Sequence, residues 1–324
     1  MTPSGPRSAS GTQPDRGVAR ASGGGRQFLD PEVIARLAHL DVRARLVVEG
    51  FIAGMHRSPF HGFSVEFAEH RQYSPGDDLR YLDWRVFGKQ DRFYIKQYEE
   101  ETNLYAYILH DKSRSMGYGS STPTKFEYAN YIAASLAHLL LRQRDSVSLV
   151  LFSEGVERFL PGSTNPAHIR PITRALEETT PGGTTNFGAT LHDIAERMPR
   201  RGLVILISDF FGDLQDILLG LKHLRHKRHE VIVFQVLDEY EVTFPFKELT
   251  LFRGMELPQQ LFAEPRSLRE QYLAELGQFV SSLRSECLNN QSDFVTLKTT
   301  DPLDVALASF VATRMATRKW KAGN

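Results

Sequence analysis

The stretch that decides the fold is Leu104–Ser115, which reads LYAYILHDKSRS. Its first seven residues form a short apolar run of the kind found in buried strands, and a charged, hydroxyl-rich turn follows directly. Two further runs of this kind are SVSLVLF (Ser146–Phe152) and LVILI (Leu203–Ile207), with helical periodicity between them. Continuous apolar strands that alternate with helices predict a parallel sheet covered on both faces. We therefore expect an α/β fold with a doubly wound, mostly parallel sheet.

The rest of the chain predicts further elements around this sheet. The pair Thr124 and Glu127 has the spacing of a capping box and should open a helix. The other expected elements are an edge strand at Val156–Leu160, a helix opened by Asn165–Pro166, a loop at Pro181–Gly188 leading into a helix through Arg197, a helix from about Leu214, strands at Val231–Leu237 and Phe294–Lys298, a long helix at about Leu268–Leu288, and a helix opened by Asp301–Pro302. Residues 240–262 read as irregular.

Four parts are expected along the chain: a disordered tail (1–27), an N-terminal helix with a β-rich appendage (28–101), the doubly wound domain (102–315) and a basic C-terminal tail (316–324). The first part is rich in Gly, Ser, Pro and Arg and has no aromatic residue, so it cannot bury enough surface to offset its ordering entropy. Within the second part, a helix should run to about Gly54. Alternation near Ser64–His70 and Phe93–Tyr98 is typical of strands.

Composition excludes several classes of function. Lys plus Arg and Asp plus Glu both number 39, so the formal net charge is zero. The chain therefore lacks the basic excess that is expected of a nucleic-acid-binding protein. The single cysteine, Cys287, cannot form an internal disulfide and is expected to be a small buried residue. The polar N-terminus lacks the apolar core of a secretory signal, and no segment is long and apolar enough to span a membrane. We expect a cytoplasmic protein.

Polar residues follow two of the predicted strands at the point where each strand ends. Asp111 begins an Asp-x-Ser-x-Ser turn, and Asp209 follows Ser208 after the Leu203–Ile207 strand. If these two strands are neighbours, the two carboxylates lie side by side and favour a cation between them. Oxygen ligands alone favour Mg²⁺, Mn²⁺ or Ca²⁺ over zinc or copper. The alternative is that the aspartates cap helices and the hydroxyls satisfy local backbone.

This pattern resembles the metal-ion-dependent adhesion site of von Willebrand factor A-like domains. The matching residues are Asp111, Ser113, Ser115, Thr184 and Asp209. The resemblance implies that the hydroxyls bind the metal directly, that the aspartates often act through water, and that an acidic residue of a partner completes the coordination. It implies a non-enzymatic protein-binding module that uses Mg²⁺, or Mn²⁺ or Ca²⁺.

A second motif narrows the resemblance. The segment RQYSPGDDLRYLDW (Arg71–Trp84), with the helix at Ala263–Leu273 and the ending TTDPLDVAL, looks like the bacterial MoxR-associated family, a domain of unknown function. The match covers about residues 47–314. It implies an adaptor or assembly factor that acts with a MoxR-type AAA+ ATPase. The expected partners are that ATPase, a client protein that binds through an acidic residue, or both. The segment itself offers a docking surface made of Arg71, Tyr73, Asp77, Asp78, Arg80, Asp83 and Trp84. Alternatively, it is a self-contained turn that packs its aromatic residues on the main domain.

The sequence supports an enzymatic function less well than a binding function. A strand that ends in an aspartate also fits a Mg²⁺-dependent hydrolase or phosphatase using Asp111, but Ser113 occupies the place where such phosphatases need a second aspartate. A scaffold with a vestigial metal site is a third alternative. The residues His223, His226 and His229 recur at helical spacing in a basic run, and we interpret them as a solvated face at a helix end.

Overall fold

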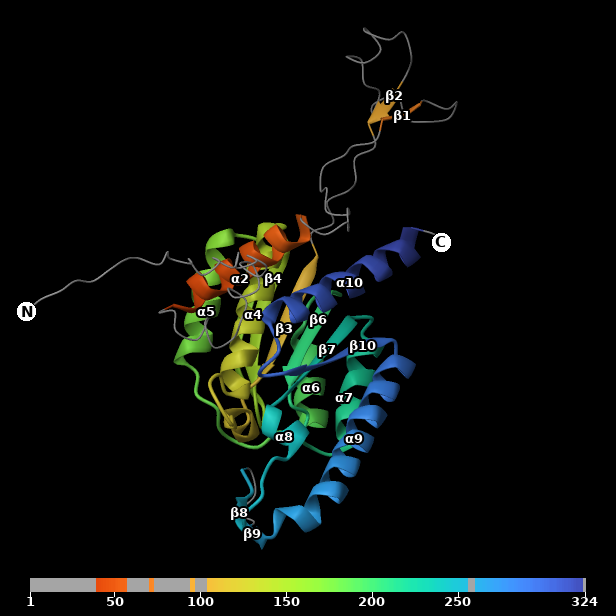
Figure 1. Ribbon diagram of the computed structural model, residues 1–324. Coiled ribbons are helices and arrows are strands. Elements are labelled where there is room, and N and C mark those ends of the chain that lie inside the picture. Colours follow the sequence, from red (N-terminus) through yellow and green to blue (C-terminus); the bar gives the residue numbers. More distant parts are fainter. Residues whose placement is uncertain (1–38, 57–69, 73–93, 97–103, 256–259, 323–324) are drawn as a thin grey trace, which may run out of the picture.

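The computed structural model describes residues 39–56, 70–72, 94–96, 104–255 and 260–322. Its centre is a six-stranded sheet with the order β10-β7-β6-β3-β4-β5 (Figure 1). The strands are β3 (Tyr105–Asp111), β4 (Ser146–Phe152), β5 (Val156–Ser163), β6 (Leu203–Ser208), β7 (Glu230–Leu237) and β10 (Ser292–Lys298). All neighbouring strands are parallel except β5, which pairs antiparallel with β4 at one edge. The predicted doubly wound, mostly parallel sheet is confirmed.

The strand order reverses between β3 and β6. From β3 the chain moves outward to β4 and β5, and it then returns to place β6 on the other side of β3. The register pairs Ile108 with Ile205 and His110 with Ile207. The expectation that these two buried strands are neighbours is therefore correct. In open α/β sheets, the carboxyl ends of the strands at such a reversal are where ligands bind.

Helices cover both faces of the sheet (Figure 1). One layer contains α2 (Leu40–His56), α4 (Lys125–Arg142), α5 (Ile169–Glu178) and α10 (Leu303–Ala322), and the other contains α6 (Phe187–Arg197), α7 (Leu214–His226) and α9 (Pro265–Asn289). Successive strand residues point to opposite faces, so Ile108 packs under the first layer and Leu109 under the second. Both faces are buried, which is why the strands read as continuous apolar runs.

Local signals in the sequence placed several helix ends well. Thr124 and Glu127 form the expected capping box at the start of α4. Asn165 caps the short helix η4 (Pro166–His168), which leads into α5. At the other end of the chain, α10 extends to Ala322, so the predicted boundary at 315 falls inside a helix. The basic residues there were read as a tail because helical periodicity is hard to see once most residues are polar.

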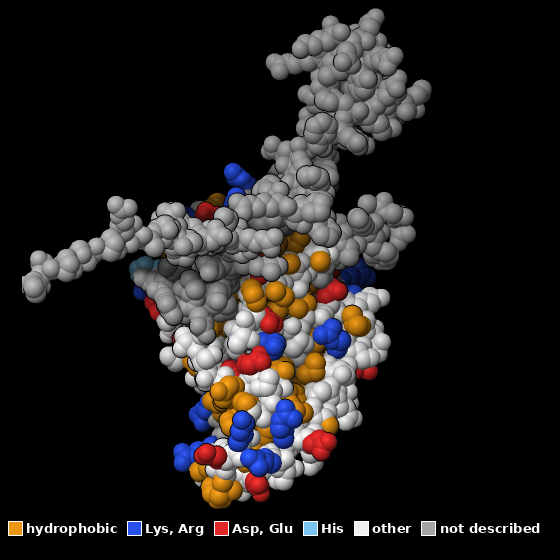
Figure 2. Space-filling model, viewed as in Figure 1, with side chains coloured by type: hydrophobic (Ala, Val, Ile, Leu, Met, Phe, Trp, Pro, Cys, Tyr) orange, Lys and Arg blue, Asp and Glu red, His pale blue; other side chains and the backbone are white. Residues whose placement is uncertain are grey.

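The segment predicted to be irregular, 240–262, contains ordered elements. A short helix α8 (Glu239–Thr243) precedes a hairpin of β8 (Thr250–Arg253) and β9 (Gln260–Ala263). Four-residue strands are too short for a clear alternation pattern, and this hairpin leaves Leu261 and Phe262 exposed. In Figure 2 hydrophobic and basic side chains lie next to one another at this end of the molecule.

The N-terminal appendage is described only in part. Strands β1 (His70–Gln72) and β2 (Tyr94–Lys96) pair antiparallel, with Arg71 opposite Ile95. The other six residues of the predicted docking surface lie outside the described residues. Among the helices that the structure does describe, none combines the length and apolar character needed to cross a membrane.

Candidate functional site

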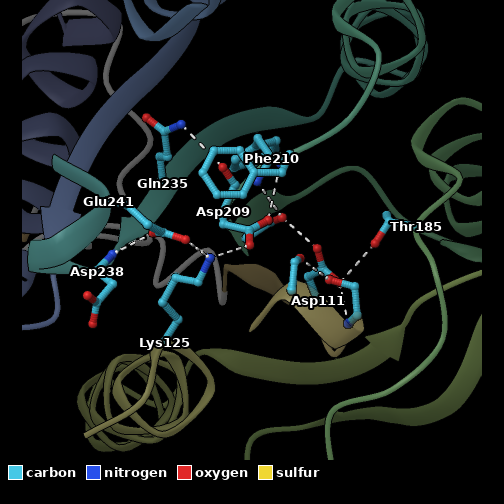
Figure 3. Close-up of polar contacts among 12 residues, drawn as sticks. Asp111, Lys125, Thr185, Asp209, Phe210, Gln235, Asp238 and Glu241 are labelled. Carbon is cyan, nitrogen blue, oxygen red and sulfur yellow. Dashed lines mark hydrogen bonds and ion pairs between the residues drawn. The ribbon is translucent and has the colours of Figure 1, made fainter. Parts of the chain in front are cut away.

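Asp111 is the last residue of β3, and its side chain is fully buried. One carboxylate oxygen, Oδ1, accepts the backbone N–H of Ser113 at 2.8 Å, and the other accepts the hydroxyl of Ser208 at 2.6 Å (Figure 3). Burial, followed by the nearby charge of Asp209, raises the pKa of Asp111 to about 7. The carboxyl group is thus poised to lose its proton when a cation arrives.

The two serines of the Asp-x-Ser-x-Ser turn present their hydroxyls together. Ser113 Oγ lies 3.0 Å from Ser115 Oγ, and both residues are buried. The turn leads into the short helix η3 (Arg114–Gly117), which curls the chain back and keeps the two hydroxyls on the same side. Their spacing allows both oxygens to contact one ion.

The loop between α5 and α6 is fastened to this turn by two backbone hydrogen bonds. The N–H of Gly182 donates to the carbonyl of Lys112 at 2.7 Å, and the N–H of Arg114 donates to the carbonyl of Gly183 at 3.0 Å. Gly183 has φ +78°, and a Cβ there would lie 3.1 Å from Ser153 Oγ. A glycine at this position therefore sets the path of the loop.

The two threonines of this loop direct their hydroxyls to different partners. Thr184 turns away from Asp111, and its hydroxyl donates to Glu154 Oε1 at 3.1 Å. The next residue, Thr185, directs its hydroxyl to Asp111 Oδ1 at 3.4 Å (Figure 3). Asp111, Ser113, Ser115 and Asp209 come together as expected, and Thr185 takes the place assigned to Thr184.

Asp209 follows β6 and is also buried. Its Oδ1 accepts the N–H of Phe211 at 3.2 Å, and its Oδ2 lies 2.7 Å from Lys125 Nζ. The same ammonium lies 2.7 Å from Glu241 Oε1 on α8, so one buried cation bridges two carboxylates (Figure 3). Burial alone lowers the pKa of Lys125, but the two carboxylates outweigh it and raise the pKa. Lys125 is therefore charged.

Phe210 fixes the turn after Asp209. Its φ is +60°, a left-handed conformation that costs a non-glycine residue about 1–2 kcal/mol. The ring is fully buried and stacks on Phe187 at a centroid distance of 5.5 Å, which offsets that cost. The N–H of Phe210 donates to Ser208 Oγ at 2.9 Å. Because Ser208 Oγ also donates to Asp111, this hydroxyl connects the ends of β3 and β6.

The donor set of this site fits a hard divalent cation. Asp111, the two serines and Thr185 offer only oxygen atoms, and those are the ligands that Mg²⁺, Mn²⁺ and Ca²⁺ prefer. Asp209 already accepts hydrogen bonds from Lys125 and Phe211, so it is suited to a contact through water. Lys112 does not add free positive charge at the turn, because its ammonium lies 2.6 Å from Glu157 Oε2.

Several of these contacts were not found from the sequence. Lys125 meets Asp209 and Glu241 across 84 and 116 residues of chain, a pairing that no local pattern encodes. One signal was present: Lys125 is the first residue of α4, where the helix dipole disfavours a cation. A lysine at that position indicates a nearby anion.

The histidine run and the cysteine have separate outcomes. His226 is exposed and His223 is partly exposed, but His229 is buried, so the interpretation of all three as a solvated face is wrong for His229. Its ring meets Tyr107 edge-on at 5.8 Å and accepts the N–H of Gly202, because the chain turns inward to begin β7. Cys287 is buried as expected, and burial raises the pKa of its thiol to about 12.

Fold and site together define a class: a doubly wound α/β protein with a buried, all-oxygen cluster where its strand order reverses. The family model described as "Protein of unknown function DUF58" matches residues 69–278, and the chain belongs to this family. Uncharacterized proteins of Mycobacterium tuberculosis and Mycobacterium bovis are each 27% identical to it over 221 residues, which is 67% of this chain and 68% of theirs.

Two solved structures resemble the chain weakly. The conserved hypothetical protein BatB from Bacteroides thetaiotaomicron has a TM-score of 0.39 at 16% identity, over 66% of this chain and 99% of that one. An aerotolerance-related membrane protein from Bacteroides fragilis, with multiple mutations to serines, has a TM-score of 0.43 at 17% identity, over 65% and 97% of the two chains. The fold assignment rests on the sheet order and not on these likenesses.

Proposed function

We propose that this protein is a von Willebrand factor A-like, metal-dependent protein-binding module of the cytoplasm. In this proposal a Mg²⁺ ion, or Mn²⁺ or Ca²⁺, is held by Asp111, Ser113, Ser115 and Thr185, and Asp209 contributes through water. The observation that carries the proposal is the convergence of these oxygen donors at the carboxyl ends of β3 and β6. The raised pKa of Asp111 is the usual consequence of crowding buried carboxylates around the place of a cation.

Charge balance supports a role in binding. Asp209 and Glu241 share the one ammonium group of Lys125, and Asp111 adds a third carboxylate close to Asp209, so the cluster carries two uncompensated negative charges when it is fully ionised. A divalent cation neutralises this excess, and its neutral hydroxyl ligands leave it able to attract another anion. The anion we propose is an acidic side chain of a partner protein, and the partner class is a MoxR-type AAA+ ATPase or its client. The protein then acts as an adaptor or assembly factor.

The test is a pull-down with a MoxR-type ATPase from the same organism, run in Mg²⁺ and in EDTA. Wild type should bind only with Mg²⁺, and Asp111→Ala should not bind in either condition. Lys112→Ala is the matched control, because it alters the adjacent residue and leaves the oxygen cluster intact. Binding that ignores both EDTA and Asp111→Ala would remove the metal from the interaction and move the interface to the Arg71–Trp84 segment.

A hydrolase using Asp111 is the second candidate, and one contact favours it. Phosphate-ester hydrolysis needs a cation beside the aspartate nucleophile, and Lys125 lies against the neighbouring carboxylate of Asp209. Against it stand Ser113 in the place of a second aspartate and the sharing of Lys125 between two carboxylates. Turnover of p-nitrophenyl phosphate in Mg²⁺ that disappears in Asp111→Asn would establish this candidate. We expect no turnover above the variant.

A further inference from the structure

A second group of metal-ligating side chains lies on the outer surface of α6 and α7. His192 and Glu196 are four residues apart on α6 and so share one face of that helix. His223 comes from α7. One nitrogen or oxygen atom from each of the three residues can be chosen such that all three lie within 4.8 Å of one another. The two imidazole rings are already in contact, with their centroids 4.2 Å apart.

The helices that carry these residues are packed too closely to shift easily. A Cβ placed on Gly220 of α7 would lie 2.7 Å from Leu191 Cδ1 of α6, so only glycine permits this approach. Gly188 of α6 also lies against Asp216 of α7, where a Cβ would make an ordinary contact at 3.6 Å. These contacts hold α6 and α7 side by side, and with them the backbone that carries His192, Glu196 and His223.

We propose that His192, Glu196 and His223 form a binding site for one borderline transition-metal ion of the Zn²⁺ class. Two imidazoles and one carboxylate form a donor set that suits zinc and related ions, whereas Mg²⁺ prefers oxygen alone. Zinc accepts histidine nitrogens at about 2.0–2.1 Å and carboxylate oxygens at about 2.0–2.2 Å in tetrahedral geometry. With three protein ligands, the fourth position belongs to water or to a group from another molecule.

A cation already occupies part of this arrangement. Lys227 Nζ lies 2.8 Å from Glu196, and His223 Nε2 lies 3.1 Å from the same carboxylate. Lys227 is an exposed side chain, and it moves away at little cost when a stronger cation arrives. Lys227 therefore competes with the metal.

The site is separate from the cluster around Asp111. Both helices start near that cluster, because α6 follows the Thr185 loop and α7 follows β6. The three residues lie further along the helices: His192 at the middle of α6, and Glu196 and His223 in the C-terminal halves of α6 and α7. The two sites share no residue, so bound zinc ties α6 to α7 without touching the oxygen donors. The inference stands whether or not the proposed function is correct.

The experiment is calorimetric titration of the EDTA-treated full chain with ZnCl₂, with Co²⁺ absorption as a second readout. Wild type should show a site that His192→Ala and His223→Ala each weaken by roughly tenfold or more, since even supporting residues of metal sites cost 10–100-fold. Lys227→Ala should bind zinc more tightly than wild type. His226→Ala, which replaces an exposed histidine on the same helix, should match wild type.

Thermal unfolding supplies an independent measure. Zinc at a hundredfold excess over its Kd should raise the wild-type Tm by about 5 °C or more, and this shift should vanish in His192→Ala. Far-ultraviolet circular dichroism checks that the variants fold, which we expect because all the substituted side chains are at least partly exposed. Identical zinc isotherms for wild type, His192→Ala and His223→Ala would overturn the proposal.

Discussion

The two clusters of potential metal ligands in this protein differ in burial, in chemistry and in origin. The cluster around Asp111 is buried, contains only oxygen donors and depends on strands β3 and β6 being neighbours. The cluster around His192 is exposed, contains imidazoles and depends on the packing of two helices. Burial makes the first cluster electrostatically expensive, so it carries an internal lysine and an aspartate of raised pKa. The second has a surface lysine, Lys227, beside it.

The largest expected effect is on stability, and it distinguishes the lysine of the buried cluster from the lysine of the exposed one. Lys125→Met leaves Asp209 and Glu241 buried without their cation, and it should lower the free energy of unfolding by about 3–5 kcal/mol. Lys227→Met is the matched control and should change stability little, because water solvates Glu196. Urea denaturation in EDTA measures both. Equal effects of the two substitutions would contradict the difference between the clusters.

A smaller effect concerns pH. Asp111 ionises near the ordinary aspartate pKa of 3.8 in the unfolded chain but near 7 in the folded protein, so the folded state holds the proton more tightly. The stability that this supplies is complete below about pH 4 and is lost by about pH 7 when no metal is present. The difference in unfolding free energy between wild type and Asp111→Asn should therefore fall over this range, by a few kcal/mol as an order of magnitude.

The difference in unfolding free energy between wild type and Asp111→Asn is more informative than either value alone, because other groups titrate in the same pH range. Buried His110, with its pKa lowered to about 4, is one of them, and it is common to both proteins. Denaturant unfolding at several pH values in EDTA gives the curves. A constant difference from pH 4 to pH 7 would show that Asp111 is ionised in the metal-free protein, contrary to our account.

The smallest expected effect is on Mg²⁺ affinity, and it distinguishes the adjacent residues Thr184 and Thr185. Thr185→Ala should weaken Mg²⁺ binding by roughly tenfold, a loss of about 1.4 kcal/mol that is typical of one hydrogen-bonding or ligand group. Thr184→Ala should leave Mg²⁺ affinity close to wild type, because the Thr184 hydroxyl donates to Glu154. Calorimetric titration with Mg²⁺ compares the two variants. The reverse result would restore the ligand assignment made from sequence.

The sequence predicted what depends on local pattern. Apolar runs located β3, β4 and β6 closely, and the residues directly after them located Asp111 and Asp209. The choice between Thr184 and Thr185 depends on the path of the loop that carries them, which a motif does not reveal. The hairpin of β8 and β9 was missed because its strands are short and three of its apolar side chains, on Leu251, Leu261 and Phe262, are exposed.

Contacts between distant elements were beyond prediction. Lys125 needs α4, β6 and α8 in their final positions, and the zinc-class site needs α6 packed against α7. In each case one of the two contacting elements carried a recognisable local pattern in the sequence. A lysine began a helix at its positive end, and a histidine and a glutamate were spaced one turn apart. The sequence did not reveal which distant element packs against that pattern.

The central claim, a hard-metal site that depends on Asp111, is tested most directly by Mn²⁺ titration followed by electron paramagnetic resonance. Using His192→Ala as the starting protein silences the exposed cluster, so that the signal reports the buried one. We predict one bound Mn²⁺ per chain, displaced by Mg²⁺, and no such binding once Asp111→Ala is added. Equal Mn²⁺ binding with and without Asp111→Ala would contradict the account.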